Sequence, residues 1–372
     1  MVRRLTIGAA VCAFAALTLP ALAGEGRIPI YTWPTVISSP GMYIVTQNLN
    51  ATGSGASVII VQASDVSIDL NGFTLETDGA PVIQVLGLTN VTIRNGTLKR
   101  GTRGIDMSLG PGGTRHKLVI EHVNVIGAQG EGIYLFQISD FAIRWCNVLK
   151  TGREGIWIDG VGPAPQVVTQ GTIEHNRLEA TAGITVRFGS SVAIVNNRLE
   201  DTTVVALPPS MGAIVYDYSY GGLIASNTVE TTVGGSGIFL GDAKGNKLYD
   251  NVVREARMNG IDLAGMSDDN LVLENVVSGC ANDGIRVDGS RNQMDRNVTN
   301  LNCQNGTGQC WGLHLTRAWG GRDNTFGRNT ARGNLGVAAV CLAVPPYPAT
   351  TDFCNEQPGA GSFNDNYMPN FF

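Results

Sequence analysis

Short segments in which apolar and polar residues alternate recur along most of the chain. Four of them read GIYLF (132–136), GIWID (155–159), GIFLG (237–241) and GIDLA (260–264). Strict alternation over about four to eight positions is typical of a β-strand with one buried face, not of a helix. The glycines that begin such segments follow one another at intervals of 23 to 29 residues. The pattern therefore predicts one short strand repeated many times.

A second repeat consists of asparagines, each placed after a short β-prone run such as VTIRN or FAIRWCN. The series comprises Asn71, Asn95, Asn124, Asn147, Asn176, Asn197, Asn227, Asn251, Asn275, Asn297 and Asn329. A unit of this size cannot close a core alone, but stacked units bury one continuous apolar column. Asparagines stacked at one turn inside the column would hydrogen-bond along it and satisfy the bent backbone.

These two repeats resemble those of the right-handed parallel β-helix proteins of the pectin-lyase-like superfamily. The resemblance implies an all-β, single-stranded right-handed parallel β-helix, a solenoid of about 11–12 coils with N- and C-terminal caps. We expect an N-terminal cap over 24–54, the β-helix over 55–343 and a C-terminal capping tail over 344–372, with Tyr367, Phe371 or Phe372 over the open end. The alternatives are a leucine-rich or a left-handed hexapeptide solenoid, and the long irregular spacing argues against both.

The first 23 residues have the features of a cleaved secretory signal peptide. Arg3 and Arg4 precede an apolar run that ends in the small-residue sequence 21–23. No later stretch is long and apolar enough to span a bilayer. We therefore expect a secreted or periplasmic protein.

The formal net charge of −5 argues against a nucleic-acid partner, because phosphate contacts require a basic surface. Most of the positive charge is arginine, whose planar fork suits bidentate recognition of carboxylates. We expect a monomer.

Six cysteines remain after the signal peptide, and an oxidising compartment permits disulfides between them. We expect Cys341–Cys354 to close the tail and Cys303–Cys310 to close a loop within one coil. Cys280–Cys303 is the competing pair. Cys146 is several coils away and is expected to be a free, buried thiol.

In each repeated strand the residue after glycine points inward and the next one points outward. The first outward column contains Asp106, Tyr134, Trp157, Thr185, Phe239, Asp262, Arg286 and His314. The second contains Ser108, Phe136, Asp159, Arg187, Gly241, Ala264, Asp288 and Thr316. The repeat that begins at Gly212 breaks the pattern, which leaves open whether Tyr216 or Asp217 belongs to this face.

Aromatic side chains beside carboxylates and guanidinium groups are typical of a sugar-binding groove. The predicted substrate-binding residues are Tyr134, Phe136, Trp157 and Phe239. The predicted catalytic residues are Asp159, Arg187, Asp262, Arg286, Asp288 and His314. In the alternative interpretation, loops of the longer coils cover and bury the aromatic residues. His116, His122 and His175 lie off this face and are expected to be ordinary turn or surface residues.

The superfamily resemblance implies a polysaccharide partner, with uronate-containing polymers and a lyase-like enzyme favoured. For β-elimination, Arg187 or Arg286 would neutralise the substrate carboxylate, and a tyrosine, histidine or arginine would abstract the adjacent proton. The DPHD-type motif of mannuronan epimerases and the GHG signature of polygalacturonases are absent, so the resemblance supplies a fold and no named reaction. The alternatives are a non-catalytic adhesive or carbohydrate-binding protein, and glycoside hydrolysis through Asp159 with another carboxylate.

Glu131 and Glu154 occupy the same position in successive repeats, so their backbones are expected to lie about 4.8 Å apart. Two carboxylates this close repel each other, and a bound Ca²⁺ would neutralise both. The alternatives are a surface ion-pair ladder with Arg103 and Arg153, and a proton shared between the two carboxylates.

Overall fold

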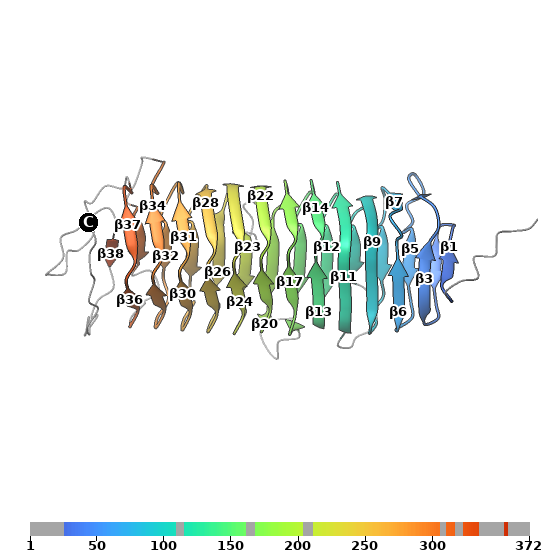
Figure 1. The fold of residues 1–372 in the computed structure, drawn as a ribbon, viewed down its shortest axis with the longest axis horizontal. Helices are drawn as coiled ribbons and strands as arrows, with labels where there is room; N and C mark the ends of the chain where they lie inside the picture. The colour runs from blue at the N-terminus through green and yellow to red at the C-terminus, as the bar shows by residue number, and fades with distance from the viewer. Residues whose placement is uncertain are drawn as a thin grey trace, which may run out of the picture.

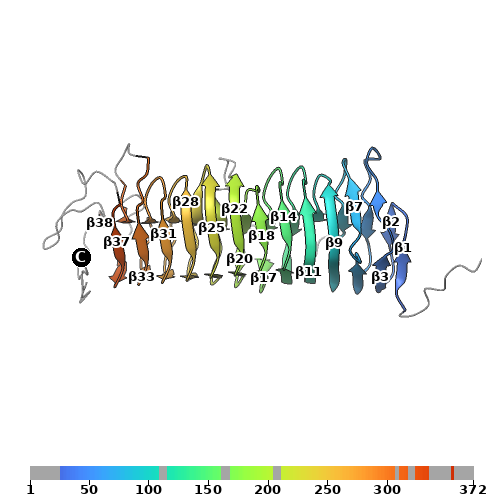
Figure 2. The ribbon, with the colours of Figure 1, turned by 45° about the horizontal axis from the view of Figure 1, so that its top comes forward.

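The computed structural model describes residues 26–108, 115–160, 168–203, 211–305, 310–316, 323–334 and 353–355. Within these residues the chain forms strands and no helix, and therefore no helix that could cross a membrane. The strands stack side by side into an elongated rod that runs from β1 (Ile28–Ile30) to β38 (Phe353–Asn355) (Figures 1 and 2).

One sheet has 13 strands, and each strand pairs in parallel with the equivalent strand of the next turn. Besides β38 it contains β2 (Thr35–Ile37), β5 (Ile59–Val61), β8 (Ile83–Val85), β10 (Ile105–Met107), β12 (Ile133–Phe136), β15 (Ile156–Asp159), β19 (Ile184–Arg187), β23 (Gly212–Asp217), β26 (Ser236–Gly241), β29 (Ile261–Ala264), β32 (Ile285–Val287) and β35 (Leu313–Leu315). We call the solvent side of this sheet the outward face.

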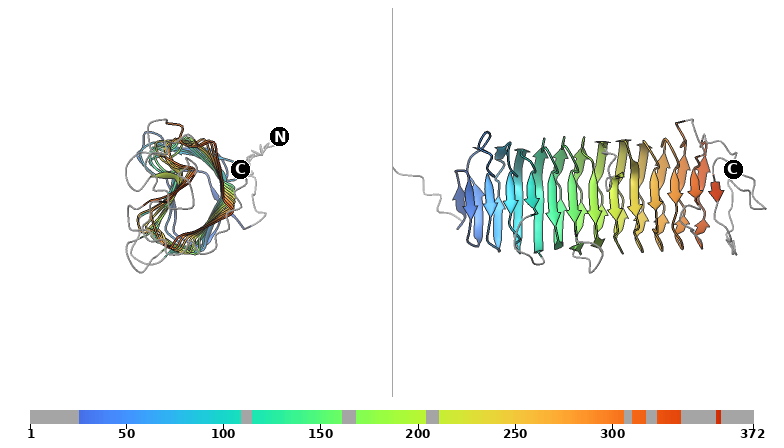
Figure 3. Two further views of the ribbon diagram at one scale, coloured as in Figure 1. Left: turned by 90° about the vertical axis from the view of Figure 1, so that its left-hand side faces the viewer. Right: turned by 180° about the vertical axis from the view of Figure 1, so that it is seen from behind.

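A 25-stranded sheet forms the other walls of the coil, as the end-on view in Figure 3 shows. Besides β1 it contains β3 (Gly41–Val45), β4 (Leu49–Asn50), β6 (Val66–Asp69), β7 (Thr74–Thr77), β9 (Val91–Arg100), β11 (Arg115–Ile126), β13 (Ile138–Arg144), β14 (Asn147–Leu149), β16 (Val168–Thr169), β17 (Thr172–Glu174), β18 (Arg177–Glu179), β20 (Gly189–Ser190), β21 (Ala193–Val195), β22 (Arg198–Thr203), β24 (Leu223–Ala225), β25 (Thr228–Val233), β27 (Lys247–Tyr249), β28 (Val252–Ala256), β30 (Leu271–Leu273), β31 (Val276–Ser278), β33 (Gln293–Asp295), β34 (Val298–Asn300), β36 (Thr325–Gly327) and β37 (Thr330–Arg332).

The core is a column of aliphatic side chains between the two sheets. Ile133 and Leu135 of β12 point inward, are fully buried, and pair in register with Ile156 and Ile158 of β15. The same register continues turn after turn, so each inward position becomes a continuous apolar row. These rows stabilise the rod, because burial of apolar surface lowers the free energy of the folded state by roughly 25 cal/mol per Å². The predicted all-β parallel β-helix is confirmed.

The predicted asparagine ladder is confirmed from Asn176 onward. The Asn176 side-chain amide donates to Asn197 Oδ1 at 3.0 Å and to the Ile143 carbonyl of the preceding turn at 2.9 Å. The backbone N–H of Asn176 also donates to Asn197 Oδ1. The ladder continues through Asn227, Asn251, Asn275, Asn297 and Asn329. A second ladder joins Asn246, Asn270, Asn292 and Asn324.

The expectation that Asn71, Asn95, Asn124 and Asn147 are interior is wrong, since none of the four is buried. Asn147 is exposed, and its amide donates to Asn124 Oδ1 at 2.8 Å on the outside of the rod. In this coil the ladder position belongs to Cys146, whose N–H donates to Asn176 Oδ1. The residue before it, Trp145, has φ 51°, and this left-handed residue fixes which neighbour turns inward. The run FAIRWCN is thus displaced by one residue from the register that its asparagine suggests.

Both ends continue the parallel pairing. The segment predicted as the N-terminal cap carries β1–β4, and β2, β3 and β4 pair in parallel with β5, β6 and β7. At the other end β38, from the predicted capping tail, pairs with β35. The predicted signal peptide and the aromatic residues Tyr367, Phe371 and Phe372 lie outside the described residues.

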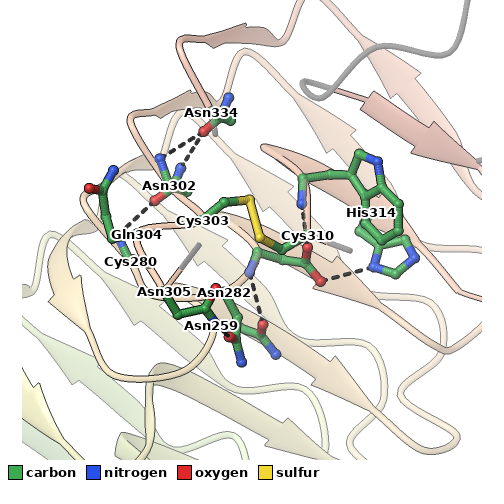
Figure 4. Close-up of a disulfide and its surroundings, with 12 residues drawn as sticks. Asn259, Cys280, Asn282, Asn302, Cys303, Gln304, Asn305, Cys310, His314 and Asn334 are labelled. Atoms are coloured by element: carbon green, nitrogen blue, oxygen red, sulfur yellow. Dashed lines mark hydrogen bonds and ion pairs between the residues drawn. A yellow bond between two sulfur atoms is a disulfide. The ribbon is translucent and has the colours of Figure 1, made fainter. Parts of the chain in front are cut away.

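The predicted disulfide Cys303–Cys310 is present, and Cys280 is a free buried thiol, so the competing pair does not form (Figure 4). Cys146 is also free and buried, as expected, and burial raises its pKa to about 12. The pairing predicted for Cys341 and Cys354 falls outside the side chains that the structure describes.

The ladder generates a stability prediction. Asn251→Ala removes a buried amide that donates to Asn275 Oδ1 and to the Ile224 carbonyl, together with the oxygen that accepts the backbone N–H and the side-chain amide of Asn227. The two Asn227 donors lose this acceptor, whereas Asn275 Oδ1 still accepts the backbone N–H of residue 251. We expect a loss of about 3 kcal/mol in the free energy of unfolding. The matched control Asn147→Ala removes an exposed amide and should cost about 0.5 kcal/mol. Urea unfolding of both variants measures the difference, and equal losses would contradict the assigned ladder.

Candidate functional site

The register of the 13-stranded sheet aligns the outward residues into the predicted columns. Tyr134, Trp157 and Thr185 are consecutive partners, and Phe239, Asp262, Arg286 and His314 follow in the same column. In the coil that begins at Gly212, Val215 joins the first outward column and Asp217 the second, whereas Tyr216 points inward and is fully buried. Gly212 pairs with Ser236 and not with Gly237, which explains the broken pattern.

The outward face is more buried than the sequence predicts. Phe239 is only 7% exposed, so the expectation of its exposure is wrong, while Tyr134, Phe136 and Trp157 are half-buried. Arginines cover the aromatic rings: Arg103 lies 4.1 Å from the Tyr134 ring centre and Arg153 lies 5.0 Å from that of Trp157. The groups over these rings are arginine side chains, whereas the alternative interpretation expected loops of the longer coils to cover them.

Phe239 is buried because glycines flank it. A Cβ on Gly212 would come within 2.9 Å of the Phe239 Cβ, and one on Gly241 would come within 2.9 Å of its ring. The ring therefore packs onto backbone and does not stand out into solvent. Gly241 lies in the same strand as Phe239 and Gly212 lies in the preceding strand β23, so this orientation depends on both strands.

Four side chains on β15 and β19 form a group that we call the quartet: Trp157, Asp159, Thr185 and Arg187. Trp157 pairs in register with Thr185, and Asp159 with Arg187. Three of the four have a buried polar atom without a hydrogen-bond partner, namely Trp157 Nε1, Asp159 Oδ1 and Thr185 Oγ1, whereas Arg187 Nε forms an ion pair with Asp217 Oδ2. A buried unpaired polar atom costs about 1–3 kcal/mol. Three of them in adjacent positions are explained if a ligand supplies the missing partners.

Burial raises the pKa of two carboxyl groups around the quartet. Burial raises the pKa of Asp159 to about 6, against the opposing effect of Arg187. Burial likewise raises the pKa of Asp217 to about 6, although Arg187 Nε lies 3.5 Å from its Oδ2. The pKa of Tyr134 rises to about 12 through burial and the nearby Asp159. The site therefore holds two carboxyl groups that exchange protons near pH 6 on either side of one guanidinium group.

A cavity of about 290 Å³ opens beside the quartet. Its walls include Arg187, Asp217, Phe239, Gly241 and Asp242. A Cβ on Gly241 would come within 2.4 Å of Asp217 Oδ1, so glycine at this position leaves room for the carboxylate. A recess with apolar walls and a few convergent charges is the usual form of a small-molecule subsite.

The predicted catalytic residues Asp262, Arg286, Asp288 and His314 lie together on β29–β35, nearer the C-terminal end of the same face. Arg286 Nη2 donates to Asp288 Oδ2 at 3.0 Å, and Thr316 Oγ1 also donates to Asp288. Burial raises the pKa of Asp262 to about 6. Sequence reasoning assigned no role to Asp283, which the structure brings into contact with His314.

Glu131 and Glu154 form ion pairs with arginines. Arg103 Nε lies 2.6 Å from one oxygen of Glu131, and Arg153 lies 3.2 Å from its other oxygen and 3.6 Å from Glu154. This is the pairing of the ion-pair alternative, except that both carboxylates are buried and not on the surface. No group of three or more histidine, cysteine, aspartate or glutamate side chains in the described part of the chain is arranged to hold a metal ion. Calcium binding at these glutamates stays a prediction.

Two of the histidines set aside in the sequence belong to a stack on the 25-stranded sheet. His122, Trp145 and His175 are nearly parallel, with ring centres 5.2 and 5.9 Å apart. All three residues are exposed, in agreement with the expected turn or surface positions of the histidines. His122 and Trp145 stand two residues before Asn124 and Asn147, but His175 stands one residue before Asn176, so the asparagine series does not reveal this stack.

The chain matches a family model described as "Right handed beta helix region" over residues 36–199, 112–277 and 182–340. A mutant of the periplasmic alginate epimerase AlgG is similar in structure, with a TM-score of 0.57 and 14% identity over 83% of this chain and 79% of that one. The catalytic domain of a GH87 alpha-1,3-glucanase mutant in complex with nigerose has a TM-score of 0.55 and 14% identity, over 79% and 64% of the two chains. No curated protein matches the sequence.

The unpaired hydroxyl of Thr185 gives a stability prediction. Thr185→Val keeps the side-chain shape and removes a buried oxygen that has no partner. We expect the free energy of unfolding to rise by about 1 kcal/mol. Thr202→Val, which removes an equally buried unpaired hydroxyl on β22, should give a similar gain. Urea unfolding tests both, and destabilisation by Thr185→Val would mean that its hydroxyl has an internal partner.

The shifted carboxyl groups predict a pH dependence. Because the folded-state pKa of Asp159 is about 6, above the ordinary value near 3.9, the folded protein binds this proton more tightly than the unfolded chain does. Stability from this group is therefore lost as the pH rises from about 4 to about 6. Asp159→Asn should be more stable than the wild type at pH 7, with the difference vanishing near pH 4. Melting temperatures of the two proteins across this range test the sign, and a pH-independent difference would contradict it.

Proposed function

The chain belongs to the right-handed β-helix family, and from this premise we propose that it binds a polysaccharide along the outward face and cleaves or modifies it. The observation that carries the proposal is the quartet, in which three buried polar atoms, on Trp157, Asp159 and Thr185, lack hydrogen-bond partners. A sugar offers both hydroxyl donors and acceptors, which these groups need, and apolar C–H surfaces that suit the Trp157 ring.

The two similar structures support the class of ligand. One is described as an alginate epimerase and the other as an alpha-1,3-glucanase in complex with nigerose. Both descriptions name carbohydrate-acting enzymes on the same fold. The predicted signal peptide, and the periplasmic description of the alginate epimerase, support export of this chain.

We favour a uronate-containing polymer and a lyase-like reaction. Arg187 lies between Asp159 and Asp217 in register, and Arg286 lies between Asp262 and His314. Either guanidinium group can neutralise a substrate carboxylate through charge-assisted hydrogen bonds. Neutralisation of that carboxylate lowers the barrier to removing the adjacent proton.

Incubation with a panel of acidic and neutral polysaccharides tests the function. An acidic polymer should give new ultraviolet absorbance from the unsaturated product of elimination. New reducing ends without absorbance would indicate a hydrolase, and retention without turnover would indicate a binding protein. Neither retention nor turnover on any polymer would contradict the proposal.

Matched variants locate the binding surface. Thr185→Val removes one polar partner, and Trp157→Phe keeps an aromatic ring but removes the indole N–H. Each should weaken retention of the bound polysaccharide by about tenfold, the value of one hydrogen bond of 1.4 kcal/mol. Thr202→Val, on the 25-stranded sheet, is the control and should bind as the wild type does. Equal retention by all three variants would place the ligand elsewhere.

A further inference from the structure

A chain of buried hydrogen bonds links β35 to β29 at the C-terminal end of the outward face. His314 Nδ1 lies 2.9 Å from Asp283 Oδ2, and the other oxygen of Asp283 accepts the Trp311 N–H at 2.6 Å. The Asp283 N–H donates to Asn259 Oδ1 at 3.2 Å, and the Asn259 amide donates to Asp262 Oδ2 at 2.8 Å. Figure 4 shows the part of this network that lies between His314 and Asn259.

The hydrogen bond to Asp283 fixes the chemical state of the imidazole. An ionised carboxylate only accepts hydrogen bonds, so the proton of neutral His314 is on Nδ1 and the lone pair is on Nε2. The ring cannot turn freely, because its centre lies 4.2 Å from that of the buried Trp311 ring. Cys310 precedes Trp311 directly in the chain, so the disulfide Cys303–Cys310 anchors this segment. The arrangement holds a base in one tautomer and one orientation.

Asp262, at the other side of the network, is suited to be the acid. It is 3% exposed, and its Oδ1 has no hydrogen-bond partner. Its pKa of about 6 arises first from burial, while Arg286 opposes the shift. In mildly acidic solution this carboxyl group is therefore protonated in a large share of the molecules. Its Oδ1 atom forms no hydrogen bond with another protein group.

The three outward residues follow one another in register: Asp262, then Arg286, then His314. The backbones of β29 and β35 are two strand spacings apart, roughly 10 Å. A sugar ring bound here would lie between the carboxyl group and the imidazole, over the guanidinium group. The same face of one sheet thus presents a base, a cation and an acid in sequence.

We propose that His314 is the catalytic base and Asp262 the catalytic acid of a β-elimination, with Asp283 as the residue that positions His314. This inference rests on the proposed function and assigns its proton transfers. His314 Nε2 takes the proton from the carbon next to the substrate carboxylate, and the C–H electron pair forms the carbon–carbon double bond. The glycosidic C–O bond breaks with its electron pair on the leaving oxygen, which takes the proton from Asp262. Exchange with water then returns a proton to Asp262 and removes one from His314.

The test combines a spectroscopic and a kinetic readout. In ¹⁵N-histidine-labelled protein without substrate, long-range ¹H–¹⁵N spectra should show neutral His314 as the Nδ1–H tautomer, assigned by its absence in His314→Gln. Asp283→Asn should abolish this preference, because the amide no longer offers a carboxylate acceptor. On a polymer that the wild type cleaves, Asp283→Asn and His314→Gln should lower kcat by about 10²–10⁴-fold with KM changed less than about threefold.

Controls separate the possible outcomes. Asp269→Asn breaks an exposed ion pair with Arg291 and should keep the wild-type kcat. His314→Gln keeps most of the side-chain volume, so it tests the base even if Asp283→Asn does not fold. Turnover that survives both variants, or an unchanged tautomer in Asp283→Asn, overturns this inference and leaves the proposed function standing. Absence of turnover on every polymer overturns both.

Discussion

Parallel register is the constraint on which the rest of this structure depends. Each strand of the 13-stranded sheet pairs in register with the equivalent strand of the next turn, so inward residues stay inward throughout the rod. A slip of one residue would expose an aliphatic row and bury a polar one. The buried asparagine ladder from Asn176 to Asn329 fixes the turn at which each coil bends and so holds the register.

The same constraint builds the candidate site. Residues more than twenty positions apart in the chain become neighbours about 4.8 Å apart on the outward face. Trp157, Asp159, Thr185 and Arg187 meet in this way, and so do Asp262, Arg286 and His314. Neither group is optimal for stability, since Thr185 Oγ1 and Asp262 Oδ1 are buried without partners. Polar groups left unsatisfied in a well-packed rod are best understood as prepared for a ligand.

Much of this could be predicted from the sequence, because the repeat states the periodicity directly. The glycine and asparagine series predicted the parallel β-helix and both outward columns, and the cysteine spacing predicted the Cys303–Cys310 disulfide. What failed depends on contacts between coils. Cys146 takes the ladder position in place of Asn147 because of a left-handed residue at Trp145, and Phe239 is buried because its neighbours are glycines. Asp283 precedes a repeat glycine like many other residues, and its role follows only from its contact with His314 one coil away.

The most direct test of the account is a crystal structure with an acidic oligosaccharide bound. The account predicts electron density for the sugar along the outward face over β15 and β19, with Thr185 Oγ1, Asp159 Oδ1 and Trp157 Nε1 in hydrogen bonds to its oxygens. It further predicts a sugar carboxylate within about 3 Å of a guanidinium nitrogen of Arg187 or Arg286. A sugar bound on the 25-stranded sheet, with the quartet still unpaired, would contradict it.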